Sequence, residues 1–136
     1  MFKKFRKNEK GFTLAELLIV VAIIGVLVAI SIPIFTSQLE KAREATDLAN
    51  MRSAYAECSS SVLTNEASST NVKLNNDGSA QENVTINQKS KGWSGDNANA
   101  KIGSYAVSGL FVDSVPAEVT VKVTADGVVT IEEPKA

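Results

Sequence analysis

The chain has 136 residues, a formal net charge of −1, no histidine and one cysteine. Without histidine, nucleophilic, acid–base and metal sites built on an imidazole are excluded, and a single cysteine excludes an internal disulfide. The sequence also lacks a Walker-type phosphate-binding loop, so we expect no enzyme, no cofactor and no metal site.

The first eleven residues are strongly basic. They carry five positive charges and one negative charge, a net of +4, and removing them from the total of −1 leaves −5 on the rest of the chain. An acidic remainder argues against nucleic-acid binding. Basic charge in front of an apolar segment predicts a cytoplasmic amino terminus and an external carboxyl terminus. The positive residues are Lys3, Lys4, Arg6, Lys7 and Lys10.

An apolar segment follows, from Phe12 to Phe35, and it is long enough to cross a membrane once. Its one charged residue is Glu16, and a charge at bilayer depth costs roughly 2.5 to 3.5 kcal/mol, so Glu16 is a functional candidate that needs a partner. No lysine or arginine follows before Lys41. The partner cation must therefore come from another chain, or from a backbone amine made by cutting this one.

The junction before the apolar segment has the order basic residues, Gly11, then Phe12. An ordinary secretory signal is cut after its apolar region at an A-x-A-like site, and no such site follows this segment. We therefore expect the apolar segment to be retained. An ordinary amino-terminal anchor would explain the basic flank, but it would leave Gly11-Phe12 and Glu16 without a role.

This junction resembles the processing signature of type IV prepilins through Lys10-Gly11-Phe12-Thr13-Leu14-Ala15-Glu16-Leu17. The resemblance implies that prepilin peptidase removes a leader of residues 1–11 by cutting between Gly11 and Phe12. It also implies N-methylation of the new amino terminus, Phe12. The family often has a bulkier residue than Ala15 before the glutamate. The motif covers about the first quarter of the chain.

The same resemblance implies a structural subunit of a type IV pilus, made at the cell membrane and assembled into a cell-surface filament for adhesion, biofilm formation or motility. Its implied partners are copies of itself, prepilin peptidase, and an assembly platform with its ATPase. Glu16 would pair with the Phe12 amine of a neighbouring subunit, a head-to-tail contact that repeats into a helical polymer. Two alternatives stay open, a pseudopilin of a type II secretion or competence DNA-uptake system and a monomeric anchored binding domain.

The single cysteine bears on the kind of pilin. Many pilins of Gram-negative bacteria have a paired-cysteine loop near the carboxyl terminus, whereas this chain has only Cys58 and in this respect resembles pilins of Gram-positive bacteria. We interpret Cys58 as a small packed hydrophobic residue on a helix, because no basic or metal-binding residues cluster beside it in the sequence.

One helix is predicted from Phe12 to about Leu63. Gly25 and Pro33 are its interior breakers, so bends are expected there, although membrane helices also tolerate both residue types. After Phe35 charged residues, among them Glu44 and Asp47, alternate with apolar ones, as in an amphipathic helix. Five apolar residues spaced 3, 4, 3 and 4 form its stripe. These are Leu48, Met51, Tyr55, Cys58 and Val62.

Residues 36–136 are predicted to form one small head, which gives an α+β fold of the type IV pilin kind. A polar loop with a short strand at 83–87 should follow the helix, and Trp93 should anchor this loop to the head. The last third predicts an antiparallel meander of strands 104–112, 118–124 and 128–132. A three-residue turn at 125–127 would pair Val123 with Val129 and Val121 with Ile131, so that the apolar face of the sheet covers the helix stripe.

Overall fold

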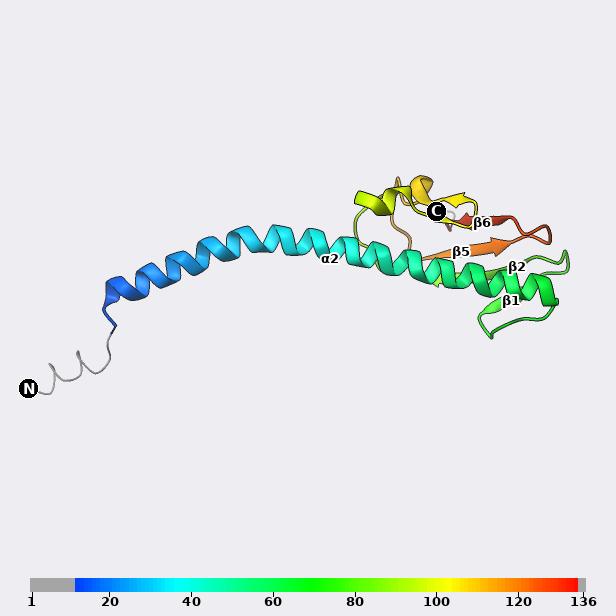
Figure 1. Cartoon of the computed structure of the whole chain (residues 1–136), viewed down its shortest axis with the longest axis horizontal. Helices are drawn as coiled ribbons and strands as arrows, with labels where there is room; N and C mark the ends of the chain where they lie inside the picture. The colour runs from blue at the N-terminus through cyan, green and yellow to red at the C-terminus, as the bar shows by residue number, and fades with distance from the viewer. Residues whose placement is uncertain (1–11, 135–136) are drawn as a thin grey trace, which may run out of the picture. The chain divides into compact units, whose positions relative to one another are not determined.

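The computed structural model describes residues 12–134 (Figure 1). The predicted leader, residues 1–11 with Gly11, lies outside the described residues. The chain divides into two compact units, Met1–Gln38 and Leu39–Ala136. One long helix and a small antiparallel sheet make up the described chain, which confirms the predicted α+β class and the type IV pilin kind of fold.

The helix α2 spans Leu14–Thr64, 51 residues without a break, as the sequence predicts to within two residues at each end. It continues through Gly25 and Pro33, because a proline removes one backbone donor but leaves the other hydrogen bonds of the helix in place. Asn65, the residue after the helix, has a φ of 56°. A left-handed residue at this position is a common way for a helix to end.

The first unit contains the apolar part of α2. Every described residue up to Gln38 is exposed, and this part of the helix is long and apolar enough to cross a membrane. A helix that is apolar on all sides has no polar face to turn to water. Its backbone groups are satisfied internally, as a lipid environment requires. The finding agrees with a membrane-anchoring segment.

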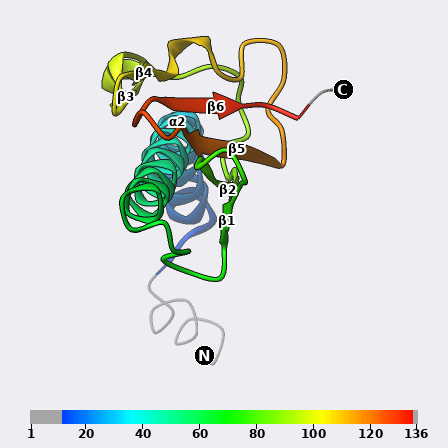
Figure 2. The same cartoon turned by 90° about the vertical axis from the view of Figure 1, so that its right-hand side faces the viewer.

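The second unit places a four-stranded antiparallel sheet against the remaining part of α2. The strands are β1 (Val72–Leu74), β2 (Ala80–Thr85), β5 (Glu118–Val123) and β6 (Val129–Glu132), in the order β1-β2-β5-β6. The view along α2 shows this sheet standing beside the helix (Figure 2). A second, two-stranded sheet joins β3 (Lys101–Ile102) to β4 (Tyr105–Ala106).

The predicted register of the last hairpin is confirmed. Val123 pairs with Val129 and Val121 with Ile131. Gly127 has a φ of +86°, the left-handed conformation that a three-residue turn with a bulge requires. All four paired residues are buried. The register holds because a shift by one residue would turn this apolar face to solvent.

The core lies between this face and the predicted stripe of α2. Leu48, Met51 and Cys58 are buried there, with Tyr55 and Val62 partly buried against them. The stripe is therefore confirmed, together with the burial of Cys58. Short 3-10 turns lie at Gly95–Asn99 (η1) and Val107–Gly109 (η2).

The predicted strand at 104–112 is wrong. Only Tyr105–Ala106 is a strand, it pairs with β3, and the next residues form the turn η2. Val107, Leu110 and Phe111 are all buried. Side chains of a strand alternate between its two faces, so residues separated by three positions and by one position cannot all lie on the same face. Phe111 also has a φ of 62°, which is incompatible with extended backbone.

The interpretation of residues 64–100 as a loop with one strand at 83–87 also needs correction. The segment contains two strands, β1 and β2, and β2 lies at Ala80–Thr85. The Asn75–Ser79 turn joins them as a hairpin, with Val72 opposite Glu82. Beyond Thr85 the backbone leaves the sheet. The backbone N–H of Asn87 donates a hydrogen bond to the carboxylate of Asp47 on α2.

Two charged residues of α2 are buried, contrary to the prediction. The alternation of charged and apolar residues predicted that Glu44 and Asp47 belong to the polar side of the helix, but they are only 2% and 0% exposed. They continue the buried stripe toward the amino terminus, ahead of Leu48 and Met51. Hydrogen bonds to the loop after β2 make this burial tolerable.

Candidate assembly site

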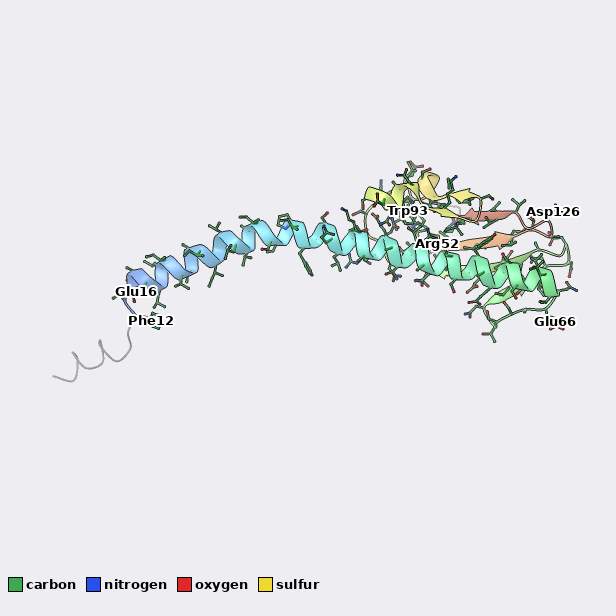
Figure 3. All side chains as sticks on the ribbon, viewed as in Figure 1. Phe12, Glu16, Arg52, Glu66, Trp93 and Asp126 are labelled. Atoms are coloured by element: carbon green, nitrogen blue, oxygen red, sulfur yellow. The ribbon has the colours of Figure 1, made fainter. Side chains whose placement is uncertain are left out.

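The amino-terminal end of α2 carries Phe12 and Glu16 close together (Figure 3). Thr13 immediately precedes the first helical residue, Leu14. The backbone N–H of Thr13 donates to Glu16 Oε2 at 2.9 Å, and the backbone N–H of Glu16 donates to Thr13 Oγ1 at 3.3 Å. This reciprocal pair is a capping box, in which two backbone donors that the helix itself cannot satisfy find partners.

The capping box changes the interpretation of Glu16. Sequence reasoning left its carboxylate without any partner in its own chain, whereas the structure gives it the Thr13 N–H. A carboxylate at a helix amino terminus is also favoured by the helix dipole. The box involves residues 13 and 16 alone, so a cut before Phe12 would leave it intact.

The signal for the box was present in the sequence as Thr13-Leu14-Ala15-Glu16. A threonine followed three residues later by a glutamate, just before an apolar run, is the ordinary signature of a helix start. Reading Glu16 only as a charge in a membrane segment hid this second role. Thr13 is therefore a functional candidate that the sequence interpretation missed.

The apolar surface behind the box is continuous over the first unit. Its large side chains are about half exposed or more, for example Leu17 at 51% and Ile24 at 54%. Gly25 has open space around it, since a Cβ built there meets nothing within 4 Å. Such an apolar surface requires lipid or other helices as its surroundings. The bends predicted at Gly25 and Pro33 stay predictions.

In the second unit three carboxylates on one side of α2 hold the loop that follows β2. Asp47 accepts the N–H groups of Asn87 and Gln88, both at 2.8 Å, through its two oxygens. Glu44 accepts the backbone N–H of Ser94 at 3.0 Å and the Ser94 hydroxyl at 2.9 Å. We call Glu40, Glu44 and Asp47 the acid clamp.

Glu40 completes the acid clamp. One of its oxygens accepts the N–H groups of Lys89 and Ser90 at 2.7 Å each, and the other lies 3.4 Å from Arg43. Burial by itself would raise the pKa of Glu40, but the two N–H donors and Arg43 outweigh it and hold the pKa below its ordinary value. The stabilisation from Glu40 is therefore present at neutral pH and is lost as the pH falls through this lowered pKa.

Trp93 lies in the clamped loop. Its ring centroid is 5.3 Å from that of Phe111, which is fully buried. Gln88 binds the same loop from inside by donating to the carbonyl oxygens of Ser90 and Gly92. The predicted role of Trp93 as an anchor of the loop is confirmed, and the clamp explains what holds the loop on the helix side.

The single cysteine of the chain, Cys58, is buried in the head. Burial, followed by the charges of Glu82 and Glu57, raises the pKa of the Cys58 thiol to about 11, so the thiol stays protonated and unreactive at neutral pH. Within residues 12–134 no group of three or more cysteine, aspartate or glutamate side chains is placed to hold a metal ion.

Fold and site together define a class of protein with a small α+β head and a long helix whose amino-terminal part is apolar and starts at a capping box that includes Glu16. The family model that matches this chain is the prokaryotic N-terminal methylation motif, over residues 6–32. The match covers the junction at Gly11 and Phe12, the capping box and most of the apolar segment.

Several relatives named as type IV pilins are similar to part of this chain. The type IV narrow pilus major component PilA5 of Thermus thermophilus is 52% identical over 52 residues, and the type IV major pilin protein PilA of Myxococcus xanthus is 42% identical over 52 residues. The type IV major fimbrial protein FimA of Dichelobacter nodosus is 45% identical over 53 residues.

These similarities are confined to part of each protein. They cover 36%, 38% and 37% of this chain and 45%, 24% and 34% of the Thermus, Myxococcus and Dichelobacter proteins, so the chain spans less than half the length of these relatives. The predicted likeness to pilins of Gram-positive bacteria is not confirmed by these comparisons.

Proposed function

We propose that this protein is a structural subunit of a type IV pilus. The observation that carries the proposal is the junction itself, where an exposed apolar helix starts at the Thr13–Glu16 capping box directly after a methylation-type processing sequence. The subunit is held in the membrane by residues 12–35, with its amino terminus on the cytoplasmic side, until it is assembled.

In the proposed pathway prepilin peptidase cuts between Gly11 and Phe12, and Phe12 is N-methylated. The α-amine of Phe12 then meets Glu16 of an adjacent subunit inside a bundle of apolar helices. Two unit charges 4 Å apart attract by about 4 kcal/mol at an effective dielectric constant of 20, before the cost of desolvation. An unmatched charge there is costly, so this contact selects the register in which subunits add.

The apolar helix contributes to association by packing against the helices of other subunits, because lipid already covers its apolar surface before assembly and only closer packing distinguishes the bundle. The contact between the Phe12 amine of one subunit and the Glu16 carboxylate of the next is head-to-tail, so the chain of subunits need not close into a ring. Repetition of it gives a filament. An assembly platform and its ATPase add subunits in this proposal, and the head faces outward for adhesion, biofilm formation or motility.

Glu16→Val tests the proposal. The variant keeps the apolar segment and loses the carboxylate, so we expect normal leader removal and membrane insertion but at least a tenfold lower yield of surface filaments, about 1.4 kcal/mol in assembly. Electron microscopy of material sheared from cells measures filaments, and mass spectrometry of the amino terminus measures processing.

Ile24→Val is the matched control, because it changes an apolar residue of the same segment and leaves Glu16 in place. Full filament yield from Glu16→Val would contradict the pairing step. If the unchanged protein loses its leader but gives only short surface fibres or none, the result would instead indicate a pseudopilin.

A further inference from the structure

We infer that Thr13 is a positioning residue for subunit assembly, acting through Glu16. This inference rests on the proposed function and adds to it the group that orients the pairing carboxylate. It starts from the reciprocal hydrogen bonds of the capping box, the N–H of Thr13 to Glu16 Oε2 at 2.9 Å and the N–H of Glu16 to Thr13 Oγ1 at 3.3 Å.

The box fixes the side chain of Glu16 before any neighbour arrives. A free glutamate side chain has several rotamers, and ordering it during assembly would oppose association. Because Oε2 is held by the N–H of Thr13, the carboxylate stays at the first turn of α2. Among residues 12–134 no hydrogen bond reaches Oε1, so this oxygen is available to the amine of a neighbour.

The hydroxyl of Thr13 is the replaceable half of the box. Its Oγ1 accepts the N–H of Glu16, a donor that α2 cannot satisfy because it lies in the first turn. In an apolar environment an unsatisfied N–H is more costly than in water, so losing the hydroxyl loosens the first turn and the carboxylate together. The expected consequence is misplacement of Glu16, while the helix behind it stays formed.

Thr13→Val removes the hydroxyl and keeps the shape of the side chain. We expect leader removal and accumulation of the processed chain to be unchanged and filament yield to fall about tenfold, within the range that the loss of a helix cap produces. Thr13→Ala must show the same defect, because it lacks the same hydroxyl. Thr13→Ser, which keeps the hydroxyl, must restore filaments.

Thr36→Val is the matched control. The Thr36 hydroxyl donates to the Ile32 carbonyl at 2.9 Å on the same helix, so this variant removes a threonine hydroxyl that has no contact with Glu16. We expect filament yield close to that of the unchanged protein. In a chain that already carries Glu16→Val, Thr13→Val should cause no further loss, because the group that it positions is gone.

Four results would overturn the inference while leaving the proposed function in place. These are filament yield from Thr13→Val equal to that from Thr36→Val, a defect in Thr13→Ser as large as in Thr13→Val, a block of leader removal in Thr13→Val, and a further loss on adding Thr13→Val to Glu16→Val. Failure of the unchanged protein to form filaments would instead count against the proposed function and, with it, against the inference.

Discussion

At the scale of single residues, carboxylates in different surroundings have different roles. Glu16 caps a helix in an apolar segment, the acid clamp accepts backbone N–H groups, and Glu82 lies on the inward face of β2 between Val72 and Val121. The Oε2 atom of Glu82 is buried without a hydrogen-bond partner among the described residues. We therefore expect Glu82 to lower the stability of the head.

Burial and then the nearby charge of Glu57 raise the pKa of Glu82 above its ordinary value. A group whose pKa is raised on folding favours the folded state below its unfolded pKa, and this contribution is lost as the pH rises through the raised value. The ionised form of Glu82 is thus held in a site that prefers the neutral acid, and its cost to stability grows as the pH rises.

Glu82→Gln should therefore raise the free energy of unfolding by roughly 0.5 to 1 kcal/mol at pH 7, with a smaller difference near pH 4. Urea unfolding of the full chain in detergent, followed by the fluorescence of Trp93, the one tryptophan, measures this. Glu66→Gln is the control, since Glu66 is an exposed acid at the far end of α2. A Glu82→Gln chain that is less stable than the control at both pH values would contradict this account.

At the scale of elements, the acid clamp explains how the irregular loop after β2 is held against α2. Each carboxylate accepts several N–H groups, so the negative charges of Glu44 and Asp47 are buried without a cation but are not left unsatisfied. Within residues 12–134 the one ion pair is Arg43 with Glu40. The loop depends on α2 for the partners of its backbone.

Asp47→Asn tests the clamp. The amide has a donor where the carboxylate has a second acceptor, so one of the two N–H groups, of Asn87 or Gln88, loses its partner. We expect a loss of about 2 to 3 kcal/mol in stability and faster hydrogen exchange in residues 87–97.

Asp126→Asn is the control for the clamp, because Asp126 is exposed at the tip of the β5–β6 hairpin (Figure 3). Mass spectrometry of peptides after hydrogen exchange, together with urea unfolding, compares the two variants. Equal midpoints and equal exchange in residues 87–97 would show that the clamp does not hold the loop.

Periodicity and turn chemistry predicted the regular elements well. The stripe of Met51 and Cys58 on α2 and the register of Val121 with Ile131 follow from repeats of 3.6 and 2 residues, and both are present. Residues 107–111 did not follow such a repeat. Their buried side chains are placed by a turn with a left-handed Phe111, which no local pattern predicts.

The candidate site was only partly predictable for a related reason. Gly11, Phe12 and Glu16 stand out by their order relative to the apolar segment, whereas Thr13 stands out only when its spacing to Glu16 is read as a helix cap. From the sequence, Glu44 and Asp47 look like solvent-facing charges. Their hydrogen-bond partners lie in a loop about 40 or more residues later in the chain, so the local sequence does not reveal them.

At the scale of the whole molecule, the head and the apolar helix have separate tasks. The head is stabilised by its own core and the acid clamp. As we propose, the apolar helix packs against the same helix of other copies, and Glu16 of the capping box sets the register. The proposed contact joins Phe12 and Glu16 of two different subunits, so it can be measured between two chains that carry different labels.

Solid-state NMR of filaments grown from a mixture of two labelled subunit pools tests this contact. One pool carries ¹⁵N at the Phe12 amine and the other carries ¹³C at the Glu16 carboxyl carbon, so a dipolar coupling between the labels reports on different chains alone. The account predicts a coupling that corresponds to a distance within about 4 Å, as in an ion pair. Coupling seen only when both labels are in the same chain would contradict it.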